Sequence, residues 1–147
     1  MTNCIVDGTY SNDETNYKSH VCVFFFSEKG LRMMNLNIQH FMSKYDEITL
    51  MLNVDNSADM FSFYETFLTD KTETKSFSIP SYNIIRKDRV MSAGGGMLVN
   101  VKDSISYICR HDLENEDIGS IWLQINCINC KPYLLNFIYR QPSSPQS

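Results

Sequence analysis

The stretch LRMMNLNIQHFMSKYDEITLMLNVDNSADMFSFYE, residues 31–65, decides the fold. Its first part, 31–38, is a mostly apolar run that follows Gly30, which predicts a strand. Residues 42–53 then carry apolar side chains at an approximately helical spacing, which predicts an amphipathic helix. The run 59–65 is again rich in strand-type residues. Together these segments predict a strand, a helix and a second strand, the unit that builds a parallel pair.

Short strand-type runs follow this unit at close spacing, with turn residues between them. They are residues 82–88, 95–101, 104–109, 119–127 and 133–140. In the fourth run Ile121, Leu123 and Ile125 alternate with polar or aromatic residues, as in a strand with one buried face. Such spacing favours hairpins in a mixed sheet over a doubly wound parallel sheet. The expected fold class is therefore α/β.

The length and composition of the chain suit a single packed domain. The chain has 147 residues, of which 43% are hydrophobic and 20% charged. We expect the domain to span residues 29–147. Residues 1–28 would form a poorly ordered lead-in, with one strand at 21–26. That strand is the longest apolar run and is far shorter than the ~18 residues of a membrane span.

The cysteines and the charge of the chain limit where the protein is expected to act and what it is expected to bind. The five cysteines are an odd number and no secretory signal is recognisable, so we expect a reducing, intracellular location and no disulfide-linked partner. The net charge of −4 argues against general nucleic-acid binding. Within 84–110, however, five positive residues face two negative ones, a local charge of +3. These are Arg86, Lys87, Arg89, Lys102 and Arg110 against Asp88 and Asp103.

Two readings of these charges stay open. The compact group at 86–89 could contact phosphates, or it could be the solvated end of a hairpin. The acidic segment 112–117 has the composition of a solvated loop, and we assign it no function.

Three further patterns are less specific. Gly94–Gly96 is followed neither by the Lys-Ser/Thr of a phosphate-binding loop nor by a helix, so we expect the start of a hairpin where backbones pass closely. Cys127 and Cys130 have the spacing of half a zinc site, but no second pair completes it, and such a pair is more often structural or incidental. The histidines His20, His40 and His111 form no ligand pattern.

Asn37 and Glu65 stand at the carboxyl ends of two predicted strands. In α/β sheets ligands collect at these ends, so the two side chains could converge on one site. Strand ends also meet water, and by spacing alone both residues could simply be solvated.

Six motifs resemble a known family when they are taken in order. They are LRMMNLNIQHFMSKYDEITLML, YETFL, IPSYNIIRKDR, GGGMLVNVK, IWLQI and FIYRQPSS, over about residues 29–147. They look like the reverse-transcriptase-associated endonuclease domain of non-LTR retrotransposons, a member of the endonuclease/exonuclease/phosphatase superfamily. The resemblance implies a four-layered α/β sandwich, with two mixed sheets flanked by helices. It also implies DNA nicking by hydrolysis of a phosphodiester, with Mg²⁺ as cofactor and Mn²⁺ as its substitute.

The resemblance also implies roles for single residues. Glu65 matches the metal-binding glutamate, Asn37 the asparagine that orients phosphate or water, and Tyr139 the tyrosine that contacts the scissile phosphate. The partner would be DNA and not a membrane, and the location would be nuclear during action on DNA and otherwise cytoplasmic. Less specific candidates for contact with nucleic acid are Arg86, Lys87, Arg89 and Arg140.

The sequence also departs from the family pattern. The Gly-Asp-x-Asn and Ser-Asp-His motifs should follow YRQPSS, and this chain contains neither. We therefore expect the N-terminal part of such a domain, inactive by itself, and leave open whether the chain is an enzyme. The alternative is a non-catalytic remnant or a small nucleic-acid-binding or interaction module. Loss of the later strands should leave apolar surface exposed and make the fragment marginally stable. Phe67 replaces the usual tryptophan.

Overall fold

The computed structural model describes residues 21–25, 30–54, 58–88, 95–115 and 119–139. It has one α-helix, α1 (Tyr45–Val54), and three 3₁₀ turns, η1 (Phe41–Lys44), η2 (Thr74–Phe77) and η3 (His111–Leu113). The strands are β1 (Val21–Phe25), β2 (Arg32–Asn37), β3 (Met60–Tyr64), β4 (Tyr82–Lys87), β5 (Met97–Lys102), β6 (Tyr107–Cys109), β7 (Gly119–Ile125) and β8 (Tyr133–Tyr139).

The larger sheet has five strands in the order β1-β2-β3-β5-β4. β2 and β3 are parallel, and their last register pair is Asn37 with Tyr64. The other neighbours in this sheet are antiparallel. The predicted strand–helix–strand unit and the mixed sheet are thus confirmed. β1, which comes from the segment expected to precede the domain, pairs with β2 and extends this sheet. Residues 1–20 lie outside the described part of the chain.

The predicted helix begins as a 3₁₀ turn at Phe41 and continues as α1. Asp46 and Glu47 lie in the first turn of α1, where carboxylates interact favourably with the helix dipole. Ile48 and Leu52, four residues apart, are buried against the larger sheet. The connection between β2 and β3 therefore lays an apolar helix face on the sheet.

The smaller sheet has three antiparallel strands in the order β6-β7-β8. Ile121, Leu123 and Ile125 are buried, and the residues between them are partly exposed, as the alternation in the sequence predicts. On the opposite face Ile108, Leu134 and Ile138 are 50%, 47% and 54% exposed. The inner face of this sheet is thus apolar and covered, and its outer face carries exposed apolar side chains.

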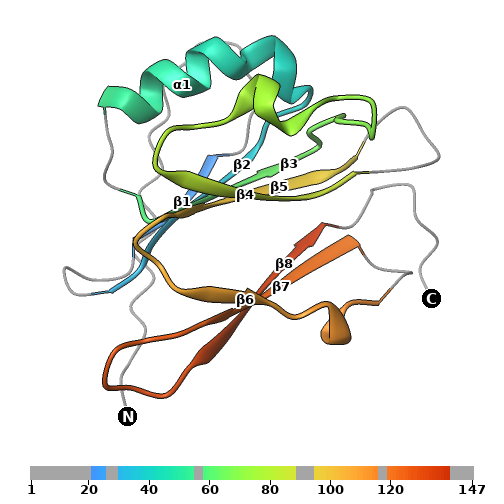
Figure 1. Ribbon diagram of the computed structural model, residues 1–147. Coiled ribbons are helices and arrows are strands. Elements are labelled where there is room, and N and C mark those ends of the chain that lie inside the picture. The colour runs from blue at the N-terminus through green and yellow to red at the C-terminus, as the bar shows by residue number, and fades with distance from the viewer. Residues whose placement is uncertain (1–20, 26–29, 55–57, 89–94, 116–118, 140–147) are drawn as a thin grey trace.

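The described elements form three layers: α1, the larger sheet and the smaller sheet (Figure 1). Between α1 and the larger sheet, Phe41 is fully buried and packs its ring edge-on against Phe63 and Phe77, with centroids 5.2 and 5.6 Å apart. Burial of each such ring contributes about 1.5–3 kcal/mol. The core between the two sheets contains Met60, Met97, Val99, Val101, Ile121, Leu123, Ile125 and Phe137.

The architecture is α/β with two sheets, as the sequence predicts, and the four-layered sandwich stays a prediction. Among the described residues no helix has the length and apolar character needed to cross a membrane.

Candidate functional site

The carboxyl ends of β2 and β3 lie side by side, and the chain segments that leave them remain hydrogen-bonded. The backbone N–H of Ile38 donates to the Tyr64 carbonyl, and that of His40 donates to the Glu65 carbonyl, both at 2.9 Å. These bonds follow from the parallel register in which Asn37 is paired with Tyr64. The structure therefore brings Asn37 and Glu65 to the same end of the larger sheet.

Four residues in these two segments have left-handed backbone conformations. Their φ angles are 43° at Gln39, 81° at His40, 55° at Glu65 and 55° at Phe67. The His40 ring packs edge-on against Phe67 with centroids 5.9 Å apart. A residue held in such a region costs on the order of 1–3 kcal/mol, and such residues cluster at functional sites. Tertiary hydrogen bonds hold the backbone around Glu65 in a conformation that its sequence would not select.

A third segment, at the start of β5, supports the Glu65 loop. The N–H of Phe67 donates to the Gly95 carbonyl at 2.9 Å, and that of Thr66 donates to the Gly96 carbonyl at 3.4 Å. Gly96 has φ +87°, and a Cβ there would lie 2.7 Å from Thr66 Oγ1. The expected close passage of backbones at the glycines thus holds at Gly95 and Gly96, while Gly94 lies outside the described residues.

The smaller sheet brings Tyr139, the last residue of β8, to the same place. Its hydroxyl donates to Glu65 Oε1 at 2.7 Å, although the two residues are 74 positions apart in the chain. Its ring stacks on Tyr64, with centroids 6.0 Å apart and planes at 29°. Burial raises the pKa of Tyr64, although its contact with the Ser62 hydroxyl lowers it. The site therefore lies where the ends of both sheets meet.

One oxygen atom of this site lacks a partner within the described residues, because Asn37 Oδ1 is buried without a hydrogen bond. Glu65 accepts the hydrogen bond of Tyr139 through Oε1. An unsatisfied buried polar group costs about 1–3 kcal/mol, so it calls for an explanation such as a bound ion or water. Carboxylate and amide oxygens are the ligands that Mg²⁺ prefers, and Mg²⁺ commonly takes only one or two protein carboxylates. The residues present fit a hard cation, although no group of three or more His, Cys, Asp or Glu gathers in the described chain.

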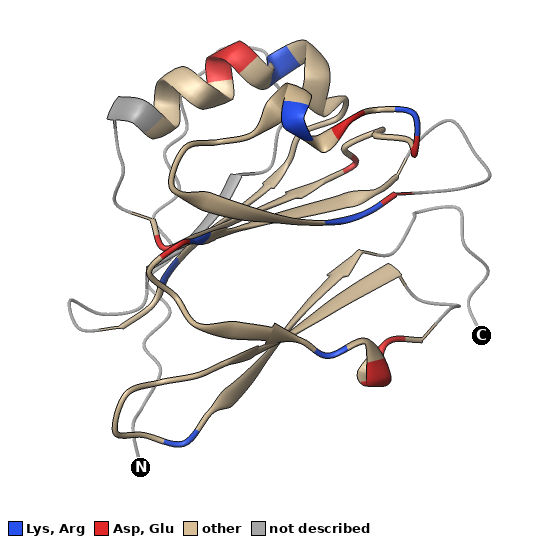
Figure 2. Ribbon diagram, viewed as in Figure 1, with Lys and Arg blue, Asp and Glu red and all other residues tan. Residues whose placement is uncertain are grey.

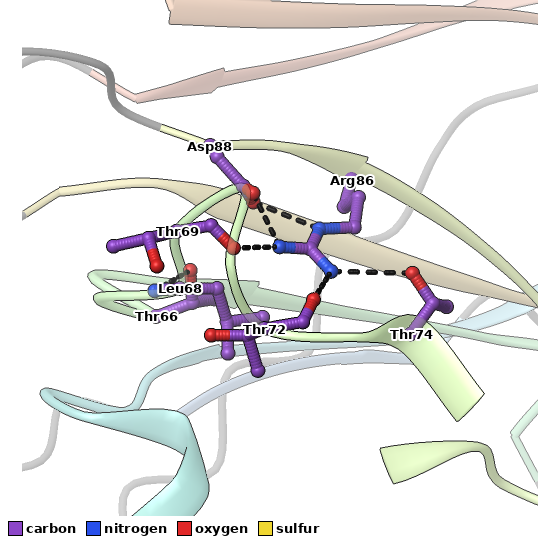
Figure 3. A network of polar contacts seen from close by, with 7 residues as sticks. All are labelled: Thr66, Leu68, Thr69, Thr72, Thr74, Arg86 and Asp88. Carbon is purple, nitrogen blue, oxygen red and sulfur yellow. Dashed lines mark hydrogen bonds and ion pairs between the residues drawn. The ribbon is translucent and has the colours of Figure 1, made fainter. Parts of the chain in front are cut away.

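Arg86, a candidate contact to nucleic acid, has its guanidinium occupied within the protein (Figure 3). It donates to the carbonyls of Thr69 at 2.6 Å and Thr72 at 2.7 Å, and to Thr74 Oγ1 at 3.2 Å. Its Nε also donates to Asp88 Oδ1 at 2.9 Å. Arg86 thus holds the loop between β3 and β4, and its binding of nucleic acid stays a prediction. Arg89 and Arg140 lie outside the described residues.

Lys87 links the two sheets. Its Nζ donates to Glu114 Oε2 at 2.8 Å and to the Ser120 carbonyl at 3.2 Å. His111 Nδ1 lies 3.1 Å from the other oxygen of Glu114, whose side chain is only 19% exposed. The description of 112–117 as a solvated loop is therefore wrong at Glu114, because Lys87, His111 and the packing of the sheets hold this carboxylate in place. In Figure 2 a positive segment directly adjoins a negative one at the end of β4, and at η3 a positive segment is followed closely by negative ones.

We expect the Lys87–Glu114 pair to make stability depend on pH. Burial raises the pKa of Glu114, but hydrogen bonds from Lys87 and His111 lower it more, so the net shift is downward from the ordinary 4.5. A depressed pKa in the folded state stabilises the protein above the ordinary value, and this contribution is lost as the pH falls through the folded value. Urea unfolding at a series of pH values below about 5 should therefore show a smaller loss for Lys87→Met than for the wild type. Equal losses would contradict the assignment; Lys75→Met, which removes an exposed pair, is the control.

The resemblance did not assign Tyr64 or Ser62 to the site. Ser62 and Tyr64 lie two residues apart in β3, so both face the smaller sheet, and Ser62 Oγ donates to Asn35 Oδ1 on the neighbouring strand. This alternation, together with the position of Tyr64 directly before Glu65, is the signal in the sequence that could have revealed them.

Among known proteins, no family model matches the chain and no curated protein matches it.

Proposed function

We propose that the chain is the N-terminal part of an endonuclease/exonuclease/phosphatase domain of the non-LTR retrotransposon type, whose complete form nicks DNA with Mg²⁺. The observation that carries the proposal is the hydrogen bond from Tyr139 to Glu65 Oε1. The resemblance assigns both residues to one catalytic centre, although Glu65 follows a strand of the larger sheet and Tyr139 ends a strand of the smaller one. An unrelated fold gives no reason for these two side chains to meet.

The side chains of the site have separate roles in this proposal. Glu65, with Asn37 beside it, would hold the cation, which when bound supplies positive charge that stabilises the phosphate oxygens. Tyr139 fixes the orientation of the Glu65 carboxylate, and the Tyr64 ring supports Tyr139 by stacking. Partners that orient a ligand in this way commonly matter for affinity almost as much as the ligand itself.

The chain itself should not turn over substrate. Hydrolysis needs a group that orients or deprotonates the attacking water. The family places those groups in the Gly-Asp-x-Asn and Ser-Asp-His motifs, which this sequence does not contain. We therefore propose a metal site without a complete catalytic centre; nuclear action on DNA belongs to the complete domain.

The second candidate, a non-catalytic nucleic-acid-binding module, gains no support from Arg86 and Lys87, the two basic candidates that the structure describes. Arg86 and Lys87 would have to give up intramolecular contacts before either could bind a phosphate.

Binding of Mn²⁺, used as a probe for Mg²⁺ and followed by electron paramagnetic resonance, tests the metal site. Glu65→Gln should abolish specific binding because it removes the carboxylate that the described residues place at the site. Tyr139→Phe should weaken binding by about tenfold, because the carboxylate loses its orienting hydrogen bond. Glu73→Gln is the matched control, since it changes an exposed carboxylate that pairs with Lys75, and it should bind like the wild type.

Equal Mn²⁺ affinity of the wild type and Glu65→Gln would overturn the metal site. A plasmid-nicking assay with Mg²⁺ tests the second part of the proposal: robust nicking by the wild type that Glu65→Gln loses would show that the chain is catalytic as it stands.

A further inference from the structure

A tight turn between β7 and β8 brings two thiols together. The last register pair of the hairpin is Ile125 with Tyr133, and Cys127 and Cys130 lie in the loop between them. Ile128 and Asn129 are the central turn residues, and Asn129 has φ 62°. In a β-turn the first and fourth Cα atoms are less than about 7 Å apart, so the backbone holds the two cysteines as neighbours.

Both thiols are free, and the loop that carries them projects into solvent. Cys130 is exposed and Cys127 is partly exposed. Between them the Ile128 side chain is 91% exposed, an unusual position for a large apolar group. A hydrogen bond with Cys130 raises the pKa of Cys127, and burial and the charge of Cys130 raise it further. The turn therefore presents two sulfur atoms next to each other at the surface, in an arrangement that suits half of a zinc site.

We propose that Cys127 and Cys130 of two copies of the chain bind one Zn²⁺ in a tetrahedral site of four thiolates. The Cys-x-x-Cys spacing suits half of such a site, and soft thiolate ligands favour zinc over harder cations. Within the described residues one chain supplies two ligands, since no group of three or more potential metal ligands gathers there. The partner copy supplies the other two, and the contact between the two loops covers Ile128.

This site is independent of the one at Glu65. Cys130 precedes the start of β8 and Tyr139 ends that strand, so the seven residues of β8 separate the two sites by about 20 Å. The ligand classes also differ, since the Glu65 site offers oxygen atoms and the hairpin offers sulfur. Zinc binding by the thiols should release their protons, so affinity should rise with pH.

Zinc stoichiometry and molar mass measured together test the proposal. The full chain is reduced, freed of reductant under argon and titrated with Zn²⁺, and its mass is followed by light scattering. We expect one zinc ion per two chains, a doubling of the mass and reversal by a chelator. Cys127→Ser and Cys130→Ser should each abolish both effects. Because the changed side chains lie in a loop outside β7 and β8, the fold should persist, which circular dichroism verifies.

Two control variants separate this site from the rest of the protein. Cys109→Ser, which changes a thiol on β6, and Glu65→Gln should both dimerise with zinc like the wild type. One zinc ion per chain at unchanged mass would overturn the proposal, because the ligands would then come from one chain. Zinc-dependent dimerisation that survives Cys130→Ser, or no zinc binding by intact thiols, would overturn it equally.

Discussion

Arg86→Ala is expected to lower the free energy of unfolding by about 2–4 kcal/mol. The Arg86 side chain is 17% exposed and its partner Asp88 is 18% exposed, so solvent screens their pair only partly. The substitution leaves the carbonyls of Thr69 and Thr72 without their donor and leaves the Asp88 carboxylate without its cation. It also removes the contact of the guanidinium with the Phe77 ring, 5.4 Å from its centroid. Chemical denaturation monitored by circular dichroism measures the loss.

Two further variants show whether geometry or charge is responsible. Arg86→Lys should recover little stability, because an ammonium group cannot reach two carbonyls, a hydroxyl and a carboxylate at once. Lys75→Ala also removes the cation of an ion pair, but the side chains of that pair are 83% and 64% exposed. It should therefore change the free energy of unfolding very little. A loss below about 1 kcal/mol for Arg86→Ala would mean that the loop holds its shape without the arginine.

Gly96→Ala should be similarly destabilising, by about 2–4 kcal/mol. The new Cβ would lie 2.7 Å from Thr66 Oγ1, and the φ of +87° is one that side chains rarely adopt. Thr66 is fully buried, so its hydroxyl cannot move into solvent to relieve the contact. Because Thr66 directly follows Glu65, we also expect weaker Mn²⁺ binding.

A double-mutant cycle separates the collision from the backbone strain. Thr66→Ala removes the oxygen that the new methyl group would meet, so the double variant should lose less stability than the sum of the single variants. The strain at φ +87° would remain in the double variant. Strict additivity would show that the contact is not the cause of the loss.

The sequence predicted those parts of the fold that rest on local periodicity. The strand–helix–strand unit at 31–65 and the alternation at Ile121, Leu123 and Ile125 came from side-chain patterns repeated over several residues, and such patterns determine which face is buried. The 3₁₀ turn at Phe41 did not follow from them, because helix ends depend on tertiary contacts more than on periodicity.

The hydrogen bonds of Arg86 to its loop and the contact of Glu114 with Lys87 could not be predicted in this way. Arg86 stands in a cluster of charges that resembles a solvated hairpin end, and its partners are carbonyls 14 and 17 positions away on a loop with no periodic pattern. Glu114 lies in an acidic segment, and its partner Lys87 is 27 positions away on another sheet. Composition describes the average surroundings of a charge and gives no information on which distant group will meet it.

The same distinction between local patterns and long-range contacts applies to the candidate site. The shared location of Asn37 and Glu65 follows from the parallel pairing of two strands, which the sequence predicted. Tyr139 entered only through the family resemblance, because nothing in its own neighbourhood relates it to Glu65. The left-handed backbone at Glu65 was not predictable either, since a glutamate has no intrinsic preference for it.

The hydrogen bond between Tyr139 and Glu65 makes the site depend on the register of a single strand. Tyr139 faces the larger sheet because β8 pairs with β7 in one alignment, in which Gly119 is opposite Tyr139. A slip of one residue would turn every side chain of β8 to the other face and place Tyr139 on the outside of the sheet. The larger sheet alone would present Glu65 without its tyrosine. Assembly of the site is therefore a long-range event, and a nascent chain acquires it only when β8 has been synthesised and has paired correctly.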